Sequence, residues 1–116
     1  MDARLAVTLG PEFTDELLRR GLRWSDAKAL GGESLEISLG EGHAPLTMKV
    51  TEATLTGEAP HMVQFSLVLR GPAAPRLPQR MFRVSHARLG DYAILITPIA
   101  GTATTTDYEA CFSHAP

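Results

Sequence analysis

The pattern that most limits the possible folds is an alternation of apolar and polar residues that begins at Glu33. Every second residue is apolar between residues 35 and 39, and the same period of two returns between residues 46 and 50. This period is typical of a β-strand with one buried and one solvent face. The glycine-rich turn at residues 40–42 separates the two runs, so together they predict an antiparallel hairpin. Its predicted core residues are Leu35, Ile37, Leu39, Leu46, Met48 and Val50.

Four further runs with strand character follow this hairpin. Residues 62–69 and 92–99 are apolar at most positions, which predicts strands buried on both faces, and Pro98 and Gly101 mark the predicted end of the second. Residues 81–85 and 104–112 complete the set. Turn signals recur roughly every 8–12 residues, a spacing typical of antiparallel barrels and sandwiches. The sequence therefore predicts a mainly β fold, a small antiparallel barrel or a two-sheet sandwich, with six to seven strands.

The N-terminal part carries a helical pattern instead. Residues 11–20 begin with a proline in the first turn, followed by acids near the start and arginines at the end, and Gly21 follows as a stop signal. They predict one helix of two to three turns that plugs an open end of the barrel. Its apolar stripe consists of Phe13, Leu17 and Leu18.

Two smaller elements flank this helix in the sequence. Residues 4–9 predict an edge strand or docking arm, since their apolar residues share one face when extended. Residues 25–30 predict a single capped turn that begins at Ser25 or Asp26.

Composition and charge bound the size and surroundings of the domain. A chain of 116 residues that is 44% hydrophobic and 21% charged is typical of one globular unit. We divide it into an N-terminal arm and helix (residues 1–24) and a β core (residues 28–112). The net charge of −2 disfavours binding to nucleic acid or an anionic membrane. Cys111 is the only cysteine, which excludes an intrachain disulfide. With no signal-peptide pattern and no apolar run near the roughly 20 residues of a membrane span, we expect a cytoplasmic protein.

The charged residues are unevenly distributed along the chain. No acid lies between Glu58 and Asp91, whereas five arginines do. One interpretation is an arginine-lined loop that binds a carboxylate, a phosphate or an acidic protein surface. The other is that the arginines pair with acids of neighbouring strands and bind backbone carbonyls. The candidate binding residues are Arg70, Arg76, Gln79, Arg80 and Trp24.

Arg70 ends an apolar run, so we expect it to be partly buried and to need a carboxylate. We predict a structural ion pair with Glu109, with Asp91 as the second choice.

No catalytic signature stands out from the sequence. The four histidines lack metal-ligand spacing, Cys111 sits in a strand pattern typical of packing, and no glycine-rich phosphate loop occurs. We therefore predict a non-enzymatic protein with no catalytic residue, no metal and no cofactor.

Four segments carry a resemblance to a known family. They are FSLVLRGP, LPQRMFRV, SHARLGDYAILITPI and YEACF. Over roughly residues 28–112 the chain resembles the bacterial domain of unknown function DUF6916. It departs from that pattern at Leu35, where the family has phenylalanine, and at Ser113, where it has asparagine. The resemblance implies a compact β domain with no established activity to transfer, and it suggests a role in a bacterial or phage-tail-like assembly.

These observations predict a non-enzymatic structural or protein-interaction domain that acts through a sheet edge and the arginine loop. Its expected partner is another protein with an acidic surface, or a second copy bound through an edge strand. The alternative is a small-ligand or carbohydrate-binding barrel that uses a mouth near Trp24 and residues 76–80.

Overall fold

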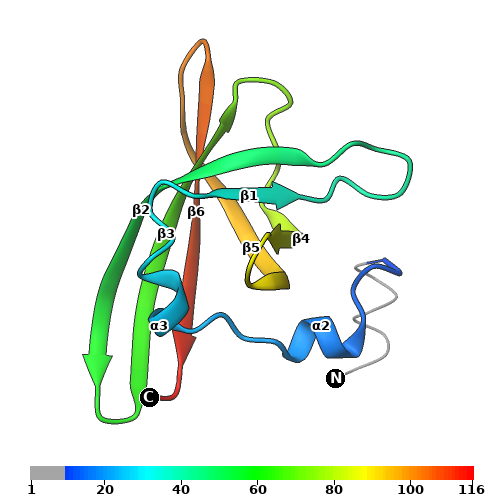
Figure 1. The fold of residues 1–116 in the computed structure, drawn as a ribbon. Helices are drawn as coiled ribbons and strands as arrows, with labels where there is room; N and C mark the ends of the chain where they lie inside the picture. Colours follow the sequence, from blue (N-terminus) through cyan, green and yellow to red (C-terminus); the bar gives the residue numbers. More distant parts are fainter. Residues whose placement is uncertain (1–9) are drawn as a thin grey trace.

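Six antiparallel strands close into a barrel in the order β1-β2-β3-β6-β5-β4 in the computed structural model, which describes residues 10–116 (Figure 1). The predicted mainly β fold is confirmed, and of the two predicted architectures the barrel is the one that forms. The predicted arm at residues 4–9 lies outside the described residues. The strands are β1 (Ser34–Ile37), β2 (Leu46–Ala59), β3 (Met62–Pro72), β4 (Arg80–His86), β5 (Gly90–Gly101) and β6 (Thr105–His114).

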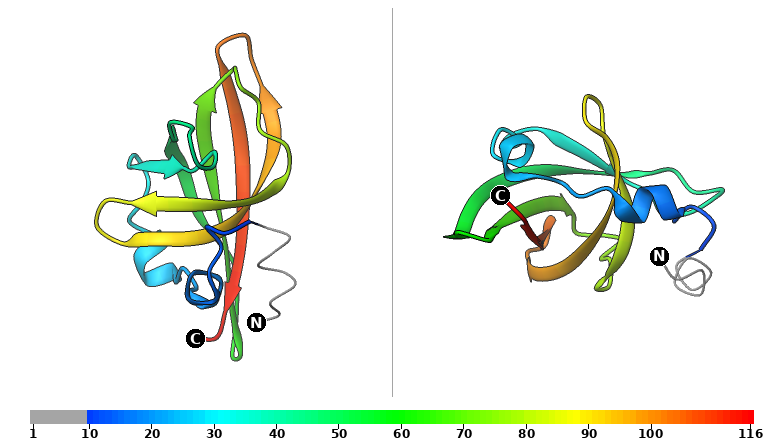
Figure 2. Two further views of the ribbon diagram at one scale, coloured as in Figure 1. Left: turned by 90° about the vertical axis from the view of Figure 1, so that its right-hand side faces the viewer. Right: turned by 90° about the horizontal axis from the view of Figure 1, so that it is seen from below.

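The barrel is closed unevenly. β3 and β6 share ten consecutive residue pairs, from Val63 opposite His114 to Pro72 opposite Thr105. By contrast, β1 and β4 close the ring through two pairs, one of which joins Ile37 to Val84. Because β3 and β6 are long, their lower halves extend with the β2–β3 hairpin beyond β4 and β5 (Figures 1 and 2).

Two short helices precede the barrel. α2 (Asp15–Arg19) is shorter than predicted because Thr14 caps it: the Thr14 Oγ1 accepts the Leu17 N–H at 3.2 Å. α3 (Trp24–Ala27) begins one residue before the predicted cap, and its N-cap, Arg23, makes no side-chain capping bond. The prediction of Ser25 or Asp26 as N-cap is therefore wrong.

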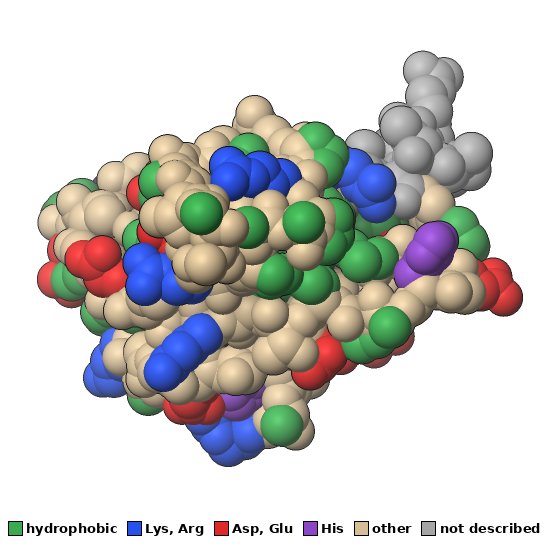
Figure 3. Space-filling model, turned by 90° about the horizontal axis from the view of Figure 1, so that it is seen from above, with side chains coloured by type: hydrophobic (Ala, Val, Ile, Leu, Met, Phe, Trp, Pro, Cys, Tyr) green, Lys and Arg blue, Asp and Glu red, His purple; other side chains and the backbone are tan. Residues whose placement is uncertain are grey.

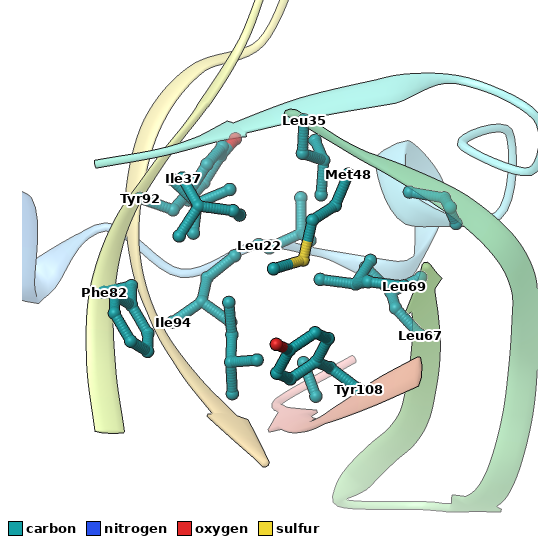
Figure 4. Packing of buried hydrophobic residues seen from close by; sticks show 14 of the residues in the cluster. Leu22, Leu35, Ile37, Met48, Leu67, Leu69, Phe82, Tyr92, Ile94 and Tyr108 are labelled. Carbon is teal, nitrogen blue, oxygen red and sulfur yellow. The ribbon is translucent and has the colours of Figure 1, made fainter. Parts of the chain in front are cut away.

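The core fills the barrel interior (Figure 4). Alternate residues of all six strands point inward, as the period of two predicts for a sheet with one buried face. The plug predicted from the first helix comes instead from the segment that follows α2, because Leu22, Ala27 and Leu30 join the main core cluster. Phe13 and Leu17 are also buried, but outside that cluster, and α2 packs near β5.

β5 departs from its prediction on its outer face. Its alternate residues are buried, but Leu95 and Ile99 are 47% and 51% exposed, so only one face packs in the core. The strand continues through Pro98 and ends at Gly101, the second of its two predicted stop residues. A shift in register against β6 follows Pro98, and a bulge of this kind tolerates a missing backbone N–H.

Candidate functional site

The arginine loop, the adjoining β5–β6 turn and the strand residues beside them form one end of the barrel, which we call the loop end (residues 70–80 and 99–108). Arg76 joins its two parts: Nε donates to the Ala73 carbonyl at 3.2 Å and Nη2 to the Thr102 carbonyl at 2.9 Å. The buried Tyr108 hydroxyl accepts the Leu77 N–H at 2.9 Å and fixes the loop from inside. Arg76 therefore stabilises the loop end through bonds within the chain.

Arg70 pairs with Asp107, and the predicted pair with Glu109 is wrong. Nε and Nη2 of Arg70 bind the two carboxylate oxygens at 2.8 and 3.2 Å. The β3–β6 register places Asp107 directly opposite Arg70, whereas Glu109 lies opposite Val68. The side chain of Arg70 is also 52% exposed rather than partly buried. Its guanidinium, through hydrogen bonds and charge, holds the pKa of the Asp107 carboxyl below its ordinary value.

The other arginines of the acid-free segment also have partners within the chain. Arg83 binds the Asp91 carboxylate at 2.8 Å, which rules out Asp91 as the partner of Arg70. Arg88 lies 3.5 Å from the Glu33 carboxylate, and Arg80 lies over the Phe82 ring, 4.9 Å from its centroid. Seen from above, lysine and arginine side chains lie scattered among hydrophobic and uncharged ones (Figure 3). This arrangement favours the structural interpretation of the arginines.

Trp24 lies far from the arginine loop. Its ring packs 5.4 Å from that of Phe65, and its backbone N–H donates to Nε2 of His114 at 3.0 Å. Because Phe65 and Pro72 lie near opposite ends of β3, Trp24 and Arg76 do not share one mouth. Gln79 is exposed at the loop end, with Arg80 beside it.

Two open grooves lie beside the N-terminal segment. One, of about 390 Å³, is lined by α2 and the β4–β5 turn, including Arg20, Arg83 and Asp91. The other, of about 590 Å³, runs between Glu12, Glu41 and neighbouring residues. Arg80 lines the second groove, but Trp24 and Arg76 line neither, so the predicted residues do not come together in one ligand mouth.

Chemically reactive groups are kept apart. Cys111 points to the outer face of β6, whereas His114 lies on the inner face with Trp24, since they are three residues apart on one strand. Desolvation, and then Glu109, raise the pKa of the Cys111 thiol, which lowers its thiolate fraction. Within residues 10–116, no cluster of three or more acidic, histidine or cysteine residues could hold a metal ion.

The barrel has an opening at the end opposite the loop end, and no sequence pattern predicts its position. β1 pairs with β2 only as far as Lys49, so the stretch Thr51–Ala59 (the β2 edge) is paired with β3 alone. β5 likewise pairs with β6 only as far as Glu109, so Ala110–His114 (the β6 edge) is also paired with β3 alone. We call this three-stranded region the open end. The signal was a mismatch in length between adjacent strands, which becomes visible only when their pairing is known.

Apolar side chains accompany the open end. Leu55 on the β2 edge is 38% exposed and Met62 at the hairpin tip is 45% exposed. On the inner face Phe112 stacks on Phe65, with ring centroids 4.7 Å apart and an interplanar angle of 12°. The open end thus combines unpaired strand edges with partly exposed apolar surface.

The fold defines a small closed β-barrel domain whose sheet is open at one end. The family model for the domain of unknown function DUF6916 matches residues 22–112, and the chain belongs to that family. No curated protein and no solved structure matches the chain. Among the described residues, no helix has the length and apolar character of a membrane span.

Proposed function

We propose that this chain is a non-enzymatic protein-interaction domain that binds its partners through the open end. The main support for this proposal is the strand pairing at the open end. Among residues 10–116, the β2 edge and the β6 edge each pair with β3 on one side and have no strand on the other. Unpaired strand edges present rows of backbone N–H and C=O groups that another strand can bind.

Strand addition of this kind takes affinity from main-chain hydrogen bonds and specificity from side-chain contacts. The exposed Leu55 and Met62 supply apolar contacts beside the unpaired backbone. The arginines have a smaller part than predicted, because those at the loop end already bind groups of this chain. An acidic partner surface therefore receives less support than a partner strand.

The wider role in a bacterial or phage-tail-like assembly stays a prediction that rests on the family resemblance. A subunit of such an assembly would need lateral contacts with other subunits, and an unpaired strand edge is a suitable place for them.

The test compares partners captured by the tagged full chain with those captured by edge variants in cells that express it naturally. Thr56→Lys and Ser113→Lys add charge to the two exposed edges, and lysine on an edge strand opposes pairing. Gln79→Lys adds the same charge at the loop end and is the matched control. We expect the edge variants to lose partners that the control keeps. Retention of every partner by both edge variants would refute the proposal.

A further inference from the structure

The two edges of the open end differ in what protects them against pairing. The β2 edge carries register shifts at Thr51 and Thr56, and two acids, Glu52 and Glu58. Bulges and charges are devices by which natural edges avoid association. The β6 edge (sequence ACFSH) contains no acid, lysine, arginine or proline, and its register against β3 is unbroken. It is therefore the edge better suited to regular pairing.

The direction of each backbone group along β6 follows from its hydrogen bonds. The carbonyl of Thr105 accepts the Thr102 N–H on the β5 side, whereas the carbonyl of Thr104 accepts the Ala73 N–H on the β3 side. In an antiparallel strand the direction alternates from residue to residue. Odd-numbered residues of β6 therefore direct their N–H and C=O groups toward β5, and even-numbered residues toward β3.

The last of the odd-numbered residues with a β5 neighbour is Glu109, which lies opposite Thr97. Beyond it, Cys111 and Ser113 direct their backbone groups to the open side of β6. These two residues provide two donors and two acceptors at the spacing of a regular strand.

We propose that a second copy of this chain occupies the β6 edge, antiparallel to the first, about a twofold axis beside Phe112. The proposal rests on the proposed function and names one partner of that surface. In this register Cys111 of each copy faces Ser113 of the other. Each such pair exchanges two backbone hydrogen bonds, and the twofold axis repeats the pair, so four bonds form.

The register follows from the geometry of the edge. Two residues that lie opposite each other in an antiparallel pair point to the same face of the joined sheet. The twofold axis must therefore pass beside one residue, which then faces the same residue of the other copy, and cannot pass midway between two residues. An axis at Cys111 would require Glu109, which already pairs with β5. An axis at Ser113 would place Cys111 opposite Ala115, which lies beyond β6. Only the axis at Phe112 uses all five residues of the β6 edge.

The side chains agree with this register. The two Phe112 residues, one from each copy, would face each other in a non-hydrogen-bonded pair, the kind of pair in which opposed side chains lie closest. Each Phe112 already stacks on Phe65, and Phe65 packs on Trp24. The dimer would therefore join two aromatic clusters into one continuous row. An equivalent pairing of the β2 edge about Leu55 would instead place Glu52 opposite Glu58, where like charges repel.

The first test uses sedimentation velocity on the full chain across a concentration series up to roughly 1 mM. Ser113→Pro removes an N–H that faces the open side, so the barrel keeps its bonds to β3 while the dimer loses two bonds by symmetry. We expect the dimer dissociation constant to rise roughly 30-fold, while Ser113→Ala keeps the value of the unchanged chain. A chain that stays monomeric throughout, or equal constants for both variants, would overturn the proposal.

The second test checks the register and does not depend on the proline variant. Ser113→Cys places a second thiol opposite Cys111 of the other copy, so a mild oxidant should give a covalent dimer. The double variant Cys111→Ser/Ser113→Cys lacks that partner and should stay uncrosslinked; equal cross-linking of the two would overturn the register. A monomeric chain whose edge variants still lose partners in cells would refute the dimer and leave the proposed function standing.

Discussion

The two ends of the β3–β6 ladder show how differently one pair of strands can be stabilised. At the loop end β6 has neighbours on both sides, and Arg70, Arg76 and Tyr108 add bonds to side chains and backbone. At the open end β6 has β3 alone as a neighbouring strand, and the packing of Trp24, Phe65 and Phe112 is joined by the hydrogen bond from the Trp24 N–H to Nε2 of His114. Hydrogen bonds and an ion pair therefore stabilise the loop end and use the polar groups that form them. Aromatic packing stabilises the open end and leaves the backbone N–H and C=O groups of its strand edges available to a partner.

A small barrel can place an interaction surface where its backbone groups have no partner within the chain. Polar groups that already bind one another within the chain would have to be separated before a partner could use them. Unpaired strand edges have no such internal competitor, and bonds formed there replace bonds to water. Aromatic packing on one face therefore stabilises the open end without occupying the edge.

The largest expected effect comes from removal of the aromatic packing. Phe65→Ala should lower the free energy of unfolding by about 3–5 kcal/mol, because Phe65 is 1% exposed and contacts both Trp24 and Phe112. Chemical denaturation followed by tryptophan fluorescence measures it, and Ser66→Ala on the outer face is the matched control. A loss below about 1 kcal/mol, as for a surface substitution, would show that packing does not hold the open end.

A smaller effect is expected at the loop end. Tyr108→Phe leaves the buried Leu77 N–H without its acceptor, which should cost about 1–3 kcal/mol of unfolding free energy. The substitution keeps the ring, so core packing is unchanged. Hydrogen exchange should show faster exchange of the Leu77 amide, with little change at Phe65. Unaltered exchange of that amide would mean that another group fixes the loop.

Much of this fold could be predicted from local patterns, whereas the pairing partners could not. Alternation between residues 35 and 50 predicted the first hairpin correctly, because the burial of alternate residues is a property of a single strand. The same reasoning failed for the partner of Arg70. Asp107 and Glu109 lie on the same face of β6, so periodicity cannot choose between them, and only the register of β3 against β6 does.

The candidate site was harder to predict for the same physical reason. An exposed apolar residue such as Leu95 cannot be told from a buried one by its residue type, so the pattern of residues 92–99 predicts burial on both faces although only one face is buried. The open end depends on where β1 and β5 stop pairing with their neighbours, at Lys49 and Glu109. Those stopping points follow from the bending of whole strands around the barrel, which no short sequence pattern records.

A local effect should appear at single amides of the β6 edge. In dilute solution, where a monomer is favoured, the Cys111 and Ser113 amides should exchange rapidly because they face the open side. The amides of Ala110 and Phe112, which face β3, should exchange slowly. Nuclear magnetic resonance resolves this alternation, and the dimer predicts that Cys111 and Ser113 become protected as concentration rises. Equal exchange of all four amides would contradict the assigned backbone directions.

The smallest effect is expected at the ion pair on the surface of the loop end. The Asp107 pKa is below its ordinary value of 3.8 because Arg70 favours the charged form. A carboxyl whose pKa is lowered by folding stabilises the folded state above its unfolded pKa, and this contribution is lost as the pH falls through the lower folded pKa. Asp107→Asn should therefore lose slightly less stability than the unchanged chain when the pH falls through and below 3.8.

Thermal unfolding between neutral and strongly acidic pH measures this difference, and added salt should reduce it because both side chains are solvent-accessible. Glu58→Asn on the β2 edge is the control, since it removes an exposed acid at the open end. Identical pH profiles for Asp107→Asn and the control would show that the Arg70–Asp107 pair does not stabilise the loop end. The hydrogen bonds of Arg76 and Tyr108 would then account for the stability of the loop end, and the contrast with the open end would rest on these two residues.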